Sequence, residues 1–261
     1  MNILQIIIFF IFSSACFGAI DSDQDGYSDL QEIHAGTDPN KYKSMIYTGG
    51  WPYNLNKNAM QDPGFGECPD AIGCECTTTN KCPSGSVCQK LFIGSYCIPQ
   101  NGARMPRFKG VDQFGETVDI YDFANQGKNI LIEIGTASAK PSQDLSAWRS
   151  YIHDDVKKRQ WWKEKFEKIH NIIDNEDVFW IHIIHLNENK KAASSETVSG
   201  WYESYYHDNI LILADPEAKI KQWVRPTGMP TIVLLNENME LIVHSTRGIE
   251  EAFNFVIDQN K

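Results

Sequence analysis

The sequence predicts an α/β protein with a mixed central sheet flanked by helices, preceded by a small disulfide-rich module and a calcium-loop segment. Three observations lead to this prediction. Apolar strands alternate with segments of helical periodicity from residue 104 to the end of the chain. Six of the seven cysteines lie between Cys68 and Cys97. Residues 21–40 contain six acidic side chains and neither Lys nor Arg.

The composition is that of a globular protein. The chain has 261 residues, is 42% hydrophobic and carries a formal net charge of −10. This acidic balance argues against a nucleic-acid binder, which needs a basic face to displace counterions. Because no apolar run reaches the roughly 20 residues of a bilayer-spanning helix, a polytopic membrane protein is excluded as well.

The N-terminus has the pattern of an export signal. The apolar run from Ile3 to Phe12 is interrupted only by Gln5, and small residues follow it. We interpret residues 1–19 as a signal peptide and expect a periplasmic, extracellular or cell-surface protein. Ser14-Ala15-Cys16 also resembles the end of a bacterial lipobox, although Ser13 stands where that pattern has an aliphatic residue. Acylated Cys16 would then be the lipid anchor, and we expect no other attachment to a membrane.

Residues 20–40 contain a calcium-loop pattern. Carboxylates at loop positions one, three and five converge around an ion, a glycine allows the sharp turn, and a carbonyl and two later carboxylates complete the shell. Here Gly26 is the turn residue. The predicted calcium ligands are Asp21, Asp23, Asp25, the carbonyl of Tyr27, Asp29 and Glu32. The alternative is a solvated acidic linker without a metal.

The continuation from Ile33 to Pro39 contains Gly36-Thr37-Asp38-Pro39. It resembles the bacterial thrombospondin type 3 repeat, in which a short helix ends at such a turn. The resemblance implies that calcium orders this segment as a structural tether and does not act through it as a signal.

Residues 41–67 are predicted to be a linker, and residues 68–100 a cysteine-rich module. So few apolar residues cannot form a core, and three disulfides are the expected source of stability. The sequence does not choose among fifteen pairings. A zinc site is disfavoured because the module lacks the paired Cys-x-x-Cys spacing of zinc ligands. A redox-active Cys74/Cys76 pair is disfavoured because it would explain only two of the six cysteines. The cysteines are Cys68, Cys74, Cys76, Cys82, Cys88 and Cys97.

Residues 104–261 are predicted to form the large domain. Continuous apolar runs indicate buried strands, and stripes of apolar residues three to four apart indicate helices. The expected strands are 129–134, 178–186, 210–213, 231–235 and 240–244, the last two forming a hairpin. The expected helices are 142–153, 157–173, 196–206, 217–224 and 249–257.

Several segments of this domain resemble a redoxin, a family with the thioredoxin-like fold related to the peroxiredoxins. They are Pro106-Arg-Phe108, Asp112-Gln-Phe-Gly115, Val118 to Phe123, Gly127 to Ile132 and Gly228-Met229-Pro230-Thr231. The resemblance implies the thioredoxin-like fold, a cis-proline at Pro230, and a groove beside it that can pair with an extended peptide or protein.

The resemblance fails at the reactive thiols. The family has Cys-x-x-Cys at the start of the first long helix, whereas this chain has Ala139-Lys-Pro-Ser142, and no cysteine follows Cys97. Alanine cannot ionise, and a serine hydroxyl is too weakly acidic without an adjacent base. We therefore expect no catalytic residue in this domain.

Other catalytic constellations are weak. His182 and His185 are three apart on a predicted strand and face opposite sides, so we interpret them as sheet-edge or core residues and not as a metal pair. Ser138 and Ser142 have no evident histidine partner for hydrolysis. The tryptophans from Trp148 to Trp223 are expected in the helix-packing core.

The leading hypothesis is thus an exported calcium-binding protein with a redox-inactive binding or scaffold domain. A second hypothesis is a cell-envelope thiol-disulfide oxidoreductase that uses cysteines of the 68–97 module. A third is calcium-dependent adhesion.

Overall fold

A computed structural model describes residues 19–77 and 82–260. The predicted signal peptide up to residue 18 and Cys16 lie outside the described residues. The chain divides into two compact units, one ending at Ile46 and one beginning at Tyr47. Within the described residues, no helix has the length and apolar character needed to cross a membrane.

The N-terminal unit contains one short helix, α1 (Asp29–Ala35). Ser28 caps its start and forms a reciprocal capping box with Gln31. Gly36 ends it in the left-handed conformation at φ 87°, and its N–H donates to the Glu32 carbonyl. The expected short helix that stops at the Gly-Thr-Asp-Pro turn is present.

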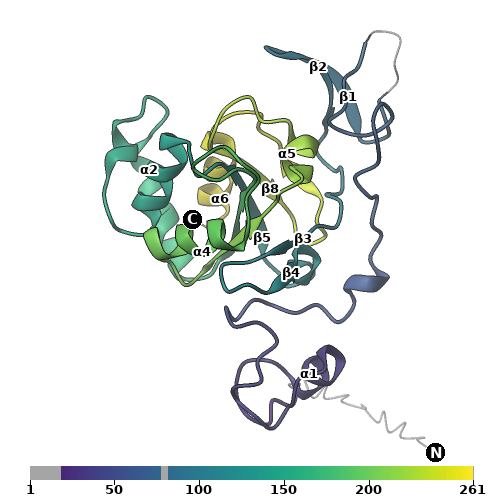
Figure 1. The fold of residues 1–261 in the computed structure, drawn as a ribbon, viewed down its shortest axis with the longest axis vertical. Coiled ribbons are helices and arrows are strands. Elements are labelled where there is room, and N and C mark those ends of the chain that lie inside the picture. The colour runs from purple at the N-terminus through teal and green to yellow at the C-terminus, as the bar shows by residue number, and fades with distance from the viewer. Residues whose placement is uncertain (1–18, 78–81, 261) are drawn as a thin grey trace, which may run out of the picture. The chain divides into compact units, whose positions relative to one another are not determined.

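The larger unit is built on a five-stranded mixed sheet in the order β7-β6-β5-β8-β9. The three parallel strands are β5 (Asn129–Gly135), β6 (Val178–Ile184) and β7 (Ile210–Ala214). The antiparallel hairpin of β8 (Thr231–Leu235) and β9 (Leu241–Val243) extends the sheet beside β5. This arrangement, drawn in Figure 1, confirms the predicted thioredoxin-like fold with a mixed sheet flanked by helices.

Helices cover one face of the sheet with a continuous apolar core, to which Leu131, Trp180 and Leu234 contribute from the strands. The helices that share this core are α2 (Lys140–Arg149), α3 (Lys168–Asp174), α4 (Ser195–Ser204) and α6 (Glu250–Gln259). The fifth helix of the unit is α5 (Lys219–Val224).

The other face is covered by chain that precedes the sheet. The hairpin of β3 (Lys109–Val111) and β4 (Thr117–Asp119) contacts β7 through an Asp112–Leu213 bridge. The 3₁₀ turn η2 (Ile120–Phe123) places Phe123 edge-on against Phe179, with ring centroids 5.1 Å apart.

The helix expected over 157–173 is wrong over residues 157–167. The chain forms two 3₁₀ turns instead, η3 (Asp155–Lys158) and η4 (Glu164–Glu167), and α3 begins only at Lys168. The reason is aromatic packing: Trp162 stands edge-on to both Trp148 and Phe166, with centroids 4.7 and 5.6 Å apart. These contacts outweigh the local preference for helix.

The cysteine-rich module is a hairpin of β1 (Ser86–Leu91) and β2 (Gly94–Pro99). Its three disulfides join Cys68 to Cys74, Cys76 to Cys88 and Cys82 to Cys97. Tertiary contacts attach the module to α5. Arg225 lies over the Tyr96 ring at 4.2 Å and its Nε–H donates to the Gly73 carbonyl.

Residues 47–62 belong to the predicted linker, residues 41–67. They contain little regular structure beyond the 3₁₀ turn η1 (Lys57–Ala59), but they pack on the domain. The fully buried carboxylate of Asp122 accepts from the Tyr47 hydroxyl at 2.7 Å and from Lys57 Nζ at 2.6 Å. Trp51 Nε1 donates to Asp112 Oδ2 at 3.0 Å. These buried polar contacts hold the segment in place.

Candidate functional site

The acidic loop brings three of its predicted ligands together. One carboxylate oxygen from each of Asp21, Asp23 and Asp25 lies within 4.8 Å of the other two. Backbone N–H groups of the loop shape this arrangement. The N–H of Tyr27 donates to Asp25 Oδ1 at 2.9 Å, and the N–H groups of Gln24 and Gly26 donate to Asp21. Each carboxylate is therefore oriented by the loop itself.

The loop also leaves buried oxygens without a donor. Oδ2 of Asp23, Oδ2 of Asp25 and Oε2 of Glu32 are each shielded from solvent and have no hydrogen-bond partner among the described residues. The Glu32 side chain is fully buried, and only its other oxygen contacts Thr37 Oγ1, at 3.4 Å. A buried carboxylate oxygen without a donor is costly unless a cation completes its coordination.

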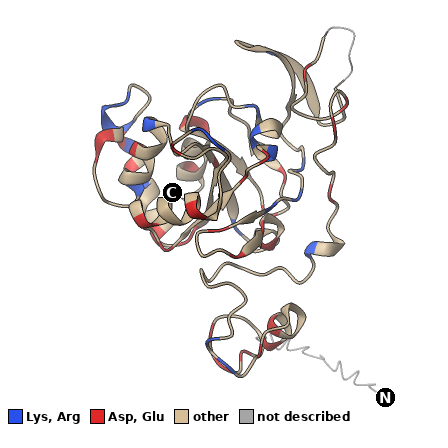
Figure 2. Ribbon diagram, viewed as in Figure 1, with Lys and Arg blue, Asp and Glu red and all other residues tan. Residues whose placement is uncertain are grey.

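The electrostatics of the loop point the same way. Burial, and then the neighbouring carboxylate of Asp25, raises the pKa of Asp23. Burial, and then Asp23 and Asp25, raises the pKa of Glu32. Figure 2 shows red carboxylate positions around this loop. Residues 21–40 contain no Lys or Arg that could neutralise this negative charge.

The remaining predicted ligands are placed differently. Both oxygens of Asp29 accept from Ser22, from its N–H at 2.8 Å and its hydroxyl at 2.7 Å. Tyr27 is buried directly after the turn at Gly26. The donor set consists of hard oxygens, which fits calcium, and Asp21, Asp23, Asp25 and Glu32 would hold it.

At the start of α2 the predicted redox positions lie in a helix terminus without a thiol. Ala139 is the N-cap residue, supplies no capping side chain and is partly exposed. Ser142 is completely buried, and its Oγ has no hydrogen-bond partner among the described residues. Ser138 is exposed, and its hydroxyl lies 3.3 Å from that of Thr136. Neither serine is placed as an accessible, base-activated nucleophile.

The Met229–Pro230 segment lies at the same end of the sheet. Ile134, at the end of β5, pairs with Thr231 at the start of β8. The peptide bond between Met229 and Pro230 is cis, and the Pro230 carbonyl accepts from the Gly248 N–H at 3.1 Å. Met229 is partly exposed and makes no hydrogen bond to any part of the chain that the structure describes.

A buried polar cluster lies on the helix-covered face beneath α2. Arg149 Nη1 donates to Glu133 Oε2 at 2.5 Å, and Trp180 Nε1 donates to the same oxygen at 3.0 Å. Arg149 Nη2 lies 3.1 Å from Nδ1 of His182, which pairs with Glu133 across β5 and β6. Glu133, Arg149 and His182 are all fully buried.

The charge state of this cluster follows from its burial. Burial, and then the positive charge of Arg149, lowers the pKa of His182 well below its ordinary value, so the ring is neutral. Its Nδ1 then accepts from Arg149. Burial raises the pKa of Glu133, and the guanidinium of Arg149 opposes that shift. Because the cluster is closed to solvent, we interpret it as a structural ion pair and not as an acid–base site.

Both histidines are core residues. His182 lies in the interior strand β6, so of the two predicted placements, sheet edge or core, the core placement holds. His185 follows β6, is 2% exposed, and has its pKa lowered to about 4 by burial and by Lys221. The ring of His182 approaches Gly135 so closely that a Cβ there would lie 2.5 Å from Nε2.

The sequence analysis did not identify the buried cluster of Glu133, Arg149 and His182. It also did not identify the contacts that the Asp122 carboxylate makes with Tyr47 and Lys57. Glu133 is the only charged residue in the apolar run Ile130 to Ile134, which is a signal of a buried charge. Its partner was not identifiable, because Arg149 lies in a helix sixteen residues away.

Comparisons with known proteins find solved structures that match about three-fifths of this chain. No family model and no curated protein matches the chain. An exposed lipoprotein thioredoxin of Streptococcus pneumoniae is 16% identical, covering 59% of this chain and 98% of that one with a TM-score of 0.41. The thioredoxin domain of a thiol-disulfide oxidoreductase of Bacteroides vulgatus is 17% identical, covering 62% and 98% with a TM-score of 0.42.

A thiol peroxidase of Chromobacterium violaceum is 13% identical, covering 62% of this chain and 88% of that one with a TM-score of 0.41. At these identities the likeness says nothing about the ligands or the activity of this chain.

Proposed function

We propose that this is an exported calcium-binding protein whose thioredoxin-like domain is a binding module and not a disulfide-exchange enzyme. The observation that carries the calcium part is the set of buried, donor-free oxygens of Asp23, Asp25 and Glu32. Calcium takes six to eight oxygen ligands in flexible geometry, which suits a loop that supplies carboxylates from successive turns.

Calorimetric titration of the full chain with calcium tests this part. We expect one site with a Kd of about 10⁻⁴ to 10⁻³ M, the range of extracellular calcium modules. Glu32→Gln should weaken binding at least tenfold, because it removes the carboxylate that can ligate with both oxygens. Glu67→Gln makes the same chemical change on an exposed side chain outside the loop and should leave the Kd unchanged. Absence of a calcium-dependent heat contradicts the proposal.

The proposal that the thioredoxin-like domain is a binding module rests on the residues at the two positions where the redoxin family has cysteines. Ala139 and Ser142 occupy the two positions, and all later residues lack cysteine. The backbone of Met229, which makes no hydrogen bond within the described chain, remains available for pairing with an extended peptide. We infer that the domain binds such a segment of a protein partner without exchanging disulfides with it.

Restoring the thiols tests whether the groove is retained. Ala139→Cys with Ser142→Cys should confer insulin reduction in the presence of dithiothreitol, because a thiol at the N-terminus of α2 has its thiolate stabilised. Ala139→Cys alone is the matched control and should give much less turnover, since the resolving thiol is missing. A folded double variant without activity contradicts a retained groove.

The competing function is an oxidoreductase that uses the module cysteines. Cys74 is bonded to Cys68 and Cys76 to Cys88, so Cys74 and Cys76 are not bonded to each other. Cys74 is fully buried. Counting free thiols on the unreduced protein should give none from these six cysteines, and a bridge opened by mild reductant without unfolding would favour the enzyme.

A further inference from the structure

A small cavity lies at the end of the sheet where β6 and β7 begin. Its volume is about 90 Å³. Glu176 and Asp208 precede these two strands, whereas Ala139 follows the opposite end of the parallel strand β5. The cavity is therefore separate from the α2 terminus and from the Met229–Pro230 segment.

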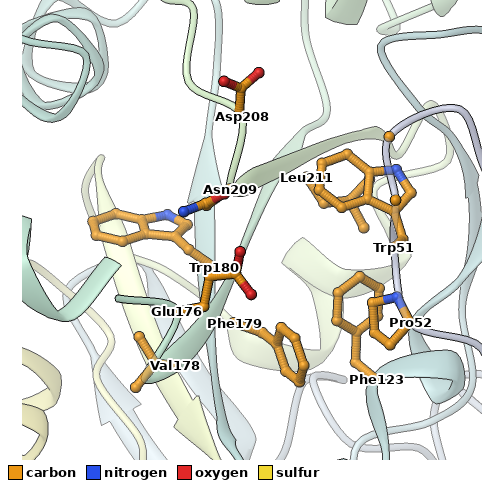
Figure 3. A pocket seen from close by; sticks show the side chains of 12 residues that line it. Trp51, Pro52, Phe123, Glu176, Val178, Phe179, Trp180, Asp208, Asn209 and Leu211 are labelled. Atoms are coloured by element: carbon orange, nitrogen blue, oxygen red, sulfur yellow. The ribbon is translucent and has the colours of Figure 1, made fainter. Parts of the chain in front are cut away.

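The inner walls of the cavity are apolar and largely aromatic. Figure 3 shows the side chains that surround it, namely Trp51, Pro52, Phe123, Phe179 and Leu211. Phe123 and Phe179 hold each other edge-on, and the Trp51 indole is fixed by its hydrogen bond to buried Asp112. The walls are thus preformed by contacts that do not depend on a ligand.

The mouth of the cavity carries two carboxylate side chains. Glu176 and Asp208 both line it, and Figure 3 shows the Glu176 carboxylate directed toward the middle of the surrounding side chains. The Glu176 side chain is 61% exposed, so solvent reaches this carboxylate. The Asp208 carboxylate accepts from the hydroxyl of Tyr206 and points away from the other lining side chains in Figure 3. An anionic ligand would be repelled here, and a hydrated metal ion would gain nothing from the apolar walls.

One ammonium group of the protein already contacts two of the lining residues. Lys128 Nζ lies 5.0 Å from the centroid of the Phe179 ring and 3.7 Å from Glu176 Oε2. The negative face of an aromatic ring attracts cations at this distance. The Lys128 contact shows that this ring and this carboxylate are arranged to accept an ammonium group.

We propose that the cavity binds a small organic ammonium group, of the alkylammonium or quaternary ammonium class. The carbon atoms of the group contact Trp51, Phe123 and Leu211, and its charge faces the Phe179 ring and Glu176. The cavity volume limits the bound group to a few carbon atoms around the nitrogen.

Paired titrations of the full chain with choline chloride and with 3,3-dimethylbutan-1-ol test the proposal. The alcohol has the same shape as choline but carries no charge. Intrinsic tryptophan fluorescence reports binding, and sodium chloride keeps the ionic strength equal because surface charges are screened. We expect choline to bind at least tenfold more tightly than the alcohol. Equal binding of the two, or binding of neither, overturns the proposal.

Variants at the mouth separate charge from shape. Glu176→Gln should weaken choline binding about threefold to tenfold and leave binding of the alcohol unchanged. Glu188→Gln alters an exposed carboxylate outside the cavity and should change neither affinity. Lys128→Met should strengthen choline binding about twofold to fivefold, because it removes the competing ammonium. An equal loss of both ligands in Glu176→Gln contradicts recognition of the charge.

Discussion

The two units of the chain treat clustered carboxylates in opposite ways. In the large unit two buried acids have a cation from the protein, Arg149 for Glu133 and Lys57 for Asp122. The buried carboxylates of Asp112 and Asp215 accept from backbone N–H groups instead. In the N-terminal unit Asp23, Asp25 and Glu32 have buried oxygens without a donor, and residues 21–40 contain no Lys or Arg. A buried carboxylate is stable when a cation or N–H donors offset its charge, and the scarcity of such partners in the loop is what supports the proposed calcium site.

Removing the cation of the buried Arg149–Glu133 pair should have the largest effect on the free energy of unfolding. Arg149→Met leaves Glu133 buried without its counter-charge, so we expect the free energy of unfolding to fall by about 3–5 kcal/mol. Urea unfolding followed by tryptophan fluorescence measures it. Adding Glu133→Gln to this variant should recover part of the loss.

Lys165→Met is the matched control for that experiment, because Lys165 is exposed and makes no ion pair within the described part of the chain. It should change the free energy of unfolding by less than about 0.5 kcal/mol. A loss below about 1 kcal/mol in Arg149→Met would show that the buried pair does not stabilise the domain.

Removing the proposed calcium ion should affect only the N-terminal unit. At a calcium concentration about 100 times the Kd, binding stabilises the loop by about 2.7 kcal/mol. Chelation should therefore expose residues 19–46 to limited proteolysis, with the cut sites located by mass spectrometry. The urea midpoint of the large unit should not change. An equal shift of both units would contradict the contrast between them.

Acid should weaken the large unit through its neutral histidines. The folded-state pKa of His185 is about 4, below its ordinary value near 6.5. Burial also lowers the pKa of His182 well below its ordinary value. As the pH falls below about 6.5 the unfolded chain binds protons that the folded chain does not, so stability is lost. We expect a loss of no more than about 1.4 kcal/mol per pH unit and histidine.

Thermal unfolding between pH 7 and pH 4 measures this effect. His185→Gln should flatten the pH dependence, because the glutamine side chain does not titrate. A midpoint that rises toward pH 4 would have the wrong sign for buried neutral histidines.

Surface ion pairs should matter least. Lys158 Nζ lies 2.6 Å from Asp155 Oδ1, and the two side chains are 80% and 44% exposed. Because water and salt screen such a pair, Lys158→Ala should change the free energy of unfolding by about 0–1 kcal/mol. A larger change, measured by urea unfolding, would mean that geometry alone and not burial sets the strength of ion pairs in this domain.

Most of the regular elements of the large unit were predictable, and the exception is instructive. The strands β5, β6, β7 and β8 lie where continuous apolar runs predicted them, because strands buried on both faces have no polar alternation. The predicted helix over 157–173 shortened to α3 because Trp162 packs on Trp148, a residue outside the segment. Local periodicity does not contain such a contact.

The sequence by itself determined the features whose parts lie close together in the chain. The calcium-loop pattern occupies twelve consecutive residues, and the absence of cysteine after Cys97 can be read directly. Only the tertiary structure decided which cysteines pair, which cation meets Glu133, and that Trp51 and Phe179 border one cavity. The physical reason is that local backbone geometry orders neighbours in sequence, whereas partners far apart meet only when the whole chain packs.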